Sequence, residues 1–108
     1  MNNVLLLGSG GREHAIAWSI YKDDNIENLY CAPGNAGTFN IATNVSLNIM
    51  NNNEILSFVN EKNIDFIIVG PEQPLENGIV DFFNEKNIKI FGSTKYASQL
   101  ETSKLFAR

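Results

Sequence analysis

The stretch that decides the fold is Val4-Leu5-Leu6-Leu7-Gly8-Ser9-Gly10-Gly11-Arg12-Glu13-His14. Its first four residues form a short apolar run, which is typical of a parallel strand that is buried on both faces. The residues from Glu13 to Tyr21 carry enough apolar side chains for one face of a helix. The sequence therefore predicts a strand, a glycine-rich turn and a helix in direct succession.

The glycine-rich turn predicts an anion site. Gly8, Gly10 and Gly11 have no Cβ atoms, so an anion can approach the backbone N–H groups closely. The first turn of the helix adds further N–H groups and the positive end of the helix dipole. The alternative is a tight strand-to-helix turn that holds no ligand. Arg12, at the exit of the turn, either pairs with a bound phosphate or lies in solvent.

The turn departs from the dinucleotide-binding pattern at two places. That pattern is G-x-G-x-x-G, followed by an acidic residue at the end of the second strand. Here the sixth position is Glu13, and the predicted second strand, residues 28–32, runs into Pro33-Gly34 with no carboxylate nearby. Both departures favour a single phosphate group over the pyrophosphate of a dinucleotide.

The composition excludes several classes of protein. The chain has 108 residues, of which 44% are hydrophobic and 19% charged, so it fits one globular domain. A net charge of −4 without a cluster of Lys and Arg argues against a nucleic-acid partner. We find no signal peptide or apolar stretch of membrane-spanning length, so no membrane partner is expected. Cys31 is the single cysteine, which rules out an internal disulfide and suits a reducing cytoplasm.

The rest of the chain alternates predicted strands and helices. Further strands are expected at 28–32, 65–69 and 88–91, with a weaker extended stretch at 40–46. Helices are expected at 54–62, with Asn53 as the N-cap, at about 76–86, and from residue 95 onward. Such alternation gives parallel βαβ units, so the expected class is α/β, an open, mainly parallel sheet with helices on both faces. No domain boundary is visible within residues 1–108.

Glycine and proline clusters follow the predicted strands, at 8–11, 33–37, 70–74 and 92–94. In open α/β sheets, ligands bind in the crevice outside the carboxyl ends of the strands, so these loops predict one site. Glu72 in the third loop would either orient an amine or lie in solvent. Asn35, with Gly34 and Gly37, would either donate hydrogen bonds to a ribose or phosphate or form a simple turn.

Other conspicuous residues have a structural interpretation. His14 lies on the first helix turn, where a lone histidine is more often structural than a ligand contact. Trp18 is expected in the core. Ser93-Thr94 is expected to cap a helix rather than to act as a catalytic pair. Cys31 has no neighbour that suggests nucleophilic chemistry, and no spacing of His, Cys and acidic residues suggests a metal site.

Taken together, these loops resemble the N-terminal region of the glycinamide ribonucleotide synthetases, also called phosphoribosylamine–glycine ligases. The matching segments are 8–15, 32–38, 69–75, 91–92 and 100–104, so the resemblance covers the whole chain. It implies a Rossmann-like pre-ATP-grasp domain that binds the 5-phosphoribosylamine side of the reaction. The substrate-binding residues that it implies, together with the loop analysis, are Gly8, Gly10, Gly11, Arg12, Gly34, Asn35, Gly37, Pro71 and Glu72.

The resemblance also implies a reaction. An enzyme of purine biosynthesis would join glycine to 5-phosphoribosylamine while ATP is cleaved to ADP and phosphate, with glycine activated as an acyl phosphate. The cofactors would be ATP and Mg or Mn, and the partners would be these small molecules and the remaining domains of the same polypeptide. Family members are much longer, so this chain is expected to be an N-terminal fragment that is inactive alone and binds no ATP. The alternative is a stand-alone Rossmann-like module that binds a nucleotide or another phosphometabolite.

Overall fold

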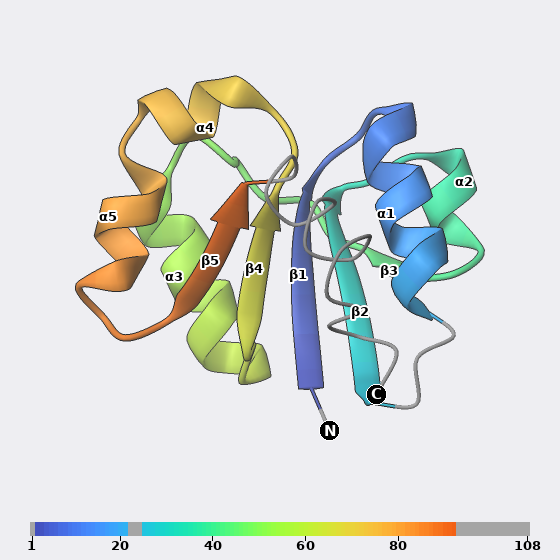
Figure 1. Cartoon of the computed structure of the whole chain (residues 1–108), viewed down its shortest axis with the longest axis horizontal. Coiled ribbons are helices and arrows are strands. Elements are labelled where there is room, and N and C mark those ends of the chain that lie inside the picture. The colour runs from blue at the N-terminus through green and yellow to red at the C-terminus, as the bar shows by residue number, and fades with distance from the viewer. Residues whose placement is uncertain (1, 22–24, 93–108) are drawn as a thin grey trace, which may run out of the picture.

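The computed structural model describes residues 2–21 and 25–92. Five strands form one sheet in the order β3-β2-β1-β4-β5, and every neighbouring pair is parallel (Figure 1). The strands are β1 (Asn2–Gly8), β2 (Ile26–Pro33), β3 (Thr43–Asn44), β4 (Phe66–Val69) and β5 (Lys89–Gly92). The helices are α1 (Gly11–Tyr21), α2 (Ala36–Phe39), α3 (Asn52–Lys62), α4 (Glu72–Glu76) and α5 (Ile79–Asn84).

The apolar run that opens the chain lies at the centre of the sheet. Residues 4–7 belong to β1, which pairs with β2 on one side and with β4 on the other. All four of these side chains are fully buried. Side chains alternate along a strand, so a central strand that is covered on both faces must be apolar throughout.

Each face of the sheet has its own apolar layer. The layer on one face joins Val4 and Leu6 to α1, whose buried side chains are Ile16, Ala17 and Ile20. The layer on the other face joins Leu5 and Leu7 to residues of α3 and α5, among them Phe58, Val59, Ile79 and Phe83. In Figure 1, α1 and α2 lie beside the β1–β2 half, and α3, α4 and α5 lie beside the β4–β5 half. The predicted fold class is therefore confirmed.

Trp18 is not in the core, and this prediction was wrong. Its side chain is 49% exposed, and its ring lies 5.3 Å from the ring of Tyr21. The cause is helical periodicity, because Ile16 and Ile20 face the sheet and a residue halfway between them points to the opposite side.

The start of α3 also differs from the prediction. The N-cap is Asn51 rather than Asn53, and its side chain accepts a hydrogen bond from the backbone N–H of Glu54 at 3.1 Å. Asn51 has the extended backbone that an N-cap requires. Three asparagines occupy positions 51–53, so composition alone could not distinguish them.

The helix expected at 76–86 is shorter, because α5 spans Ile79–Asn84 and Glu76 instead ends the preceding helix α4. Gly78 has a positive φ of 77°, which ends α4 and separates it from α5. Helix α4 begins at Glu72, so three of the five residues in the expected loop 70–74 are helical. The stretch 40–46 contains only the two-residue strand β3, and the short helix α2 before it was not predicted.

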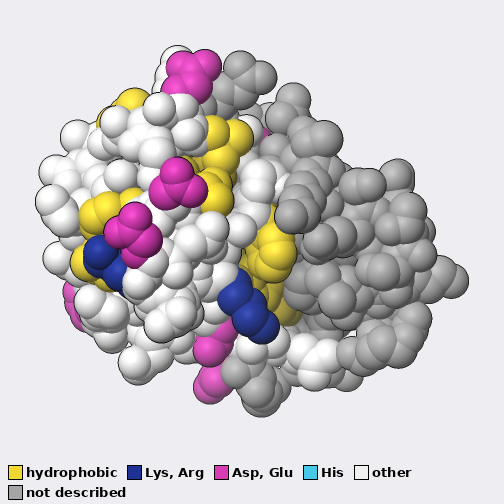
Figure 2. Space-filling view, turned by 60° about the vertical axis from the view of Figure 1, so that its left-hand side comes forward, with side chains coloured by type: hydrophobic (Ala, Val, Ile, Leu, Met, Phe, Trp, Pro, Cys, Tyr) yellow, Lys and Arg dark blue, Asp and Glu magenta, His cyan; other side chains and the backbone are white. Residues whose placement is uncertain are grey.

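The predictions for Ser93-Thr94 and for helical structure from residue 95 lie outside the described residues. Within the described part, no helix is long and apolar enough to cross a membrane. On the face drawn in Figure 2, the Lys and Arg side chains of the described residues lie apart from one another and form no basic patch.

Candidate functional site

Three of the predicted loops meet at one edge of the sheet, the edge formed by the carboxyl ends of its parallel strands. All strands are parallel, so the loops after β1, β2 and β4 leave from the same edge. Backbone hydrogen bonds join them: Gly34 N–H donates to the carbonyl of Gly8 at 3.1 Å, and Gly70 N–H donates to the carbonyl of Leu7 at 2.9 Å. The loop after β1 is thus tied to both of its neighbours. Most of the fourth predicted loop, 92–94, lies outside the described residues.

Asn35 is a second tie between the loops. Its side-chain Nδ2 donates to the carbonyl oxygens of Ser9 at 2.7 Å and Gly10 at 3.2 Å. Its Oδ1 accepts from the backbone N–H of Thr38 at 2.9 Å and caps α2. Both ends of the amide are therefore used inside the protein, so Asn35 fixes the position of the glycine turn.

Thr38 and Asn44 complete this network, and sequence reasoning missed both. Thr38 is fully buried, and its hydroxyl oxygen accepts from the backbone N–H of Asn35 at 2.8 Å and contacts Asn44 Oδ1 at the same distance. Asn44 Nδ2 donates to the carbonyl of Asn35 at 2.9 Å. The pattern Asn35-x-x-Thr38 is a capping box, and this signal could have revealed α2.

Positions 34 and 37 have no room for a side chain, so both must be glycine. Gly34 has a φ of 76°, and a Cβ there would lie 2.9 Å from the Thr38 hydroxyl oxygen and closer still to Asn44. A Cβ on Gly37 would lie 2.5 Å from the ring of His14. The half-buried His14 therefore packs on α2. An open hollow of ≈ 360 Å³ next to it is lined by Gly11, His14, Ala15 and Trp18.

Glu13 is buried beneath the glycine turn. Its Oε1 accepts a hydrogen bond from the backbone N–H of Gly10 at 2.8 Å, and the side chain is 7% exposed. A Cβ on Gly8 or on Gly70 would lie less than 3 Å from the carboxyl group, so Glu13 fills the space between two loops. Sequence reasoning had noted this residue only as a departure from the dinucleotide pattern.

The glycines of the turn are therefore not equivalent. Gly10 directs its N–H at Glu13 instead of outward. Gly11 is the first residue of α1, it is exposed, and a Cβ there would meet no described atom within 4 Å. The open approach to the turn is thus at Gly11, where the helix begins.

Two further predicted site residues belong to this edge through their backbone. Pro71 is the N-cap of α4, in the loop after β4, and Glu72 is the first residue of that helix. The side chains of Glu72 and of Arg12 lie outside the described part of the structure. Their proposed contacts with substrate stay predictions.

Cys31 lies below the loops and is fully buried. Burial raises the pKa of its thiol to about 11, the negative charge of Glu13 adds to the rise, and a hydrogen bond with Thr38 opposes it. The thiol is therefore neutral at physiological pH and is not a nucleophile.

We expect Cys31 in the folded chain to resist iodoacetamide. With a pKa of about 11, only about one thiol in a thousand is ionised at pH 8. Labelling followed by mass spectrometry should be slow, accelerate toward pH 11, and become rapid once guanidinium unfolds the chain. The unfolded thiol ionises first, so stability should fall between pH 9 and 11. Fast labelling of the folded chain at pH 8 would contradict the buried position.

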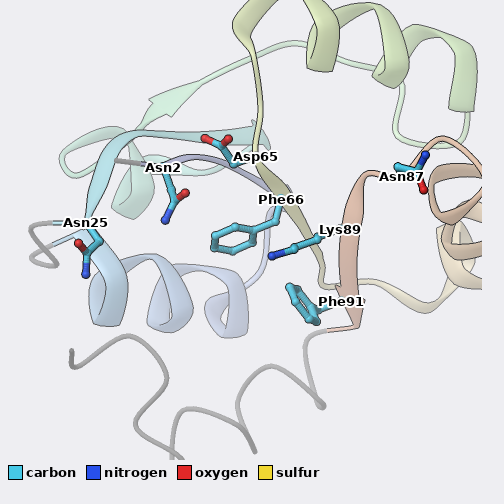
Figure 3. A pocket seen from close by; sticks show the side chains of 7 residues that line it. All are labelled: Asn2, Asn25, Asp65, Phe66, Asn87, Lys89 and Phe91. Carbon is cyan, nitrogen blue, oxygen red and sulfur yellow. The ribbon is translucent and has the colours of Figure 1, made fainter.

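A second hollow lies at the opposite edge of the sheet, on the side where the strands begin. It measures ≈ 420 Å³ and is lined by residues that lie mostly at or near the amino ends of β1, β2, β4 and β5. These residues are Asn2, Asn25, Asp65, Phe66, Asn87, Lys89 and Phe91 (Figure 3). In Figure 3, Lys89 points toward the rings of Phe66 and Phe91. This hollow is remote from the glycine turn. The described residues include no cluster of three His, Cys, Asp or Glu side chains that could hold a metal ion.

Comparison with known proteins identifies the family. Residues 2–101 match the family described as phosphoribosylglycinamide synthetase, N domain. The chain belongs to this family. It is 48% identical over 105 residues to a phosphoribosylamine–glycine ligase of Clostridium acetobutylicum and 49% identical over 105 residues to that of Agrobacterium fabrum. Each match covers 97% of this chain and 25% of the relative.

Two solved structures resemble this fold. A crystal structure of the phosphoribosylamine–glycine ligase of Thermotoga maritima is 34% identical, with a TM-score of 0.52, and the match covers 66% of this chain and 16% of that one. A saccharopine dehydrogenase from Saccharomyces cerevisiae has a TM-score of 0.67 over 85% of this chain and 21% of its own, at 20% identity. The second likeness shows the fold alone. The chain thus spans about a quarter of the length of the curated relatives it matches.

Proposed function

We propose that this chain is the N-terminal domain of a phosphoribosylamine–glycine ligase and that it binds the phosphoribosylamine side of the reaction. The observation that carries the proposal is the family match over residues 2–101, which includes all three loops tied together at one sheet edge. The matched relatives are named as this ligase, and the match covers about a quarter of their length.

In this proposal, the open N-terminus of α1 receives the phosphate group. The backbone N–H of Gly11 and the helix dipole provide hydrogen bonding and positive potential, and Arg12 adds a charge at the same end. Glu72, at the neighbouring loop, would accept a hydrogen bond from the amine and so orient it for attack. Asn35 does not contact the substrate directly but holds the turn in place.

The remaining three quarters of the polypeptide would supply the other parts of the reaction. We assign ATP, with Mg or Mn, and glycine to those parts, and we therefore expect this chain alone to bind no ATP and not to ligate. A cytoplasmic location belongs to the same proposal and is consistent with a free, reduced Cys31.

The test uses both the chain and its reading frame. The complete polypeptide should form the glycinamide product and ADP from glycine, ATP and freshly prepared 5-phosphoribosylamine. The 108-residue chain should bind ribose 5-phosphate, a stable probe, more tightly than ribose. If the chain instead binds ATP with micromolar affinity in calorimetry, or the reading frame contains no further domain, the stand-alone module is the better interpretation.

Gly11→Ala tests the assignment of the phosphate. In the complete enzyme the added Cβ would occupy the open space beside Gly11 and keep the phosphate away from the backbone N–H. We expect the KM for phosphoribosylamine to rise about ten- to a hundredfold, because loss of one charge-assisted hydrogen bond costs roughly 1.5–3 kcal/mol. The KM values for ATP and glycine should change little. Ser9→Ala, which alters the same turn without adding an atom, serves as the control. A larger loss of ATP affinity than of phosphoribosylamine affinity would show that the turn serves the other substrate.

A further inference from the structure

Glu13 stands at a position of the glycine turn that is glycine in dinucleotide-binding proteins. Counted from Gly8, it takes the place of the third glycine in the pattern G-x-G-x-x-G. In dinucleotide-binding turns that glycine allows the helix and strand to pack closely. Here the side chain that replaces it is turned inward and nearly fully buried, between the loops that follow β1 and β4.

The carboxylate of Glu13 acts as an internal ligand of the turn. It accepts the N–H of Gly10, a group that an anion would otherwise bind, at 2.8 Å. It also places a negative charge behind the loop, and this charge contributes to the raised pKa of Cys31. An anion that approaches Gly10 from outside would therefore find the N–H donor already used by Glu13. It would also be repelled by the negative charge of the Glu13 carboxylate.

We propose that Glu13 determines the specificity of this turn, because it excludes a pyrophosphate from Gly10 and leaves room for one phosphate at Gly11. The two positions differ in the structure: the amide of Gly10 is used internally, whereas Gly11 is exposed and has open space beside it. A pyrophosphate needs donors along the whole turn, but a single phosphate needs only the helix end.

The test is to neutralise the charge while preserving the shape. Glu13→Gln removes the charge but keeps an oxygen that can accept a hydrogen bond from the Gly10 N–H. The control is Glu27→Gln, which removes the same charge at an exposed site near the amino end of β2. The probes are inorganic pyrophosphate and inorganic phosphate, titrated into the 108-residue chain by calorimetry.

We expect Glu13→Gln to bind pyrophosphate about tenfold more tightly than the unmodified chain, with a smaller gain for phosphate. Glu27→Gln should change either affinity by less than about twofold, because exposed charges at a distance are screened. An equal gain in both variants, or an unchanged or weaker pyrophosphate affinity in Glu13→Gln, would overturn the proposal.

A second variant distinguishes specificity from simple support of the loop. Glu13→Gly restores the third glycine and frees the N–H of Gly10, so it should bind pyrophosphate at least as tightly as Glu13→Gln. If Glu13 only supports the loop, both variants lower the melting temperature and neither gains pyrophosphate affinity. These measurements do not involve ligation, so the proposal can fail or hold independently of the proposed function.

Discussion

Gly8→Ala should lower the free energy of unfolding by about 2–4 kcal/mol. The residue has a φ of 134°, a backbone conformation that costs an L-residue roughly 1–3 kcal/mol. The new Cβ would also lie 2.5 Å from Glu13 Cγ, and because a side chain rather than the backbone must shift, overpacking adds only about 1 kcal/mol, the low end of its range. In a thermal melt, the midpoint should fall by roughly 10–25 °C.

Gly11→Ala is the matched control for this measurement. It adds the same methyl group three residues later, inside α1, where no described atom lies within 4 Å. Alanine favours a helix over glycine, so stability should stay the same or rise by up to about 1 kcal/mol. Equal destabilisation by the two variants would mean that the turn does not have the backbone conformation described here.

Phe83→Ala should have a still larger effect on stability. Phe83 lies on α5, it is fully buried in the layer shared with α3 and β1, and it is among the largest such side chains. Removing a buried phenylalanine costs about 3–5 kcal/mol, a large part of the stability of a small domain. Urea denaturation monitored by circular dichroism should show either a much lower midpoint or no folded baseline.

Phe39→Ala is the control for Phe83→Ala. Its side chain is 73% exposed, so its removal should change the unfolding free energy by no more than about 0.5 kcal/mol. A loss at Phe39 as large as that at Phe83 would indicate that Phe39 is covered in solution.

Much of the fold could be predicted from the sequence because its strands are unusually clear. Residues 4–7 and 66–69 are apolar on both faces, a pattern that a central parallel strand produces and an exposed helix does not. Predictions failed where the structure depends on backbone conformation or on which side of a helix a residue lies. The left-handed Gly78 divides a helix that periodicity alone joins, and Trp18 is apolar but lies on the outer side of α1.

The sequence predicted where the candidate site lies but not which residues contact one another within it. The rule that loops gather at the carboxyl ends of parallel strands located the turn, Gly34, Asn35 and Pro71 at one edge. It could not show that the Asn35 side chain binds the turn itself, because the acceptors of its two hydrogen bonds are backbone carbonyl groups, which every residue carries. Nor could it show that Glu13 points inward, since an acidic residue in the first turn of a helix usually faces solvent.

The central position of β1 has a consequence for synthesis on the ribosome. Of the five strands, β1 emerges before the others, but one of its edges pairs with β4, where Phe66 is the partner of Val4. Until Phe66 has left the exit tunnel, the apolar segment 4–7 of β1 has an unpaired edge, which is the arrangement that invites aggregation. Pairing over so long a stretch of chain is also slow. Nascent chains released before residue 66 should therefore depend on chaperones far more than chains released after β5.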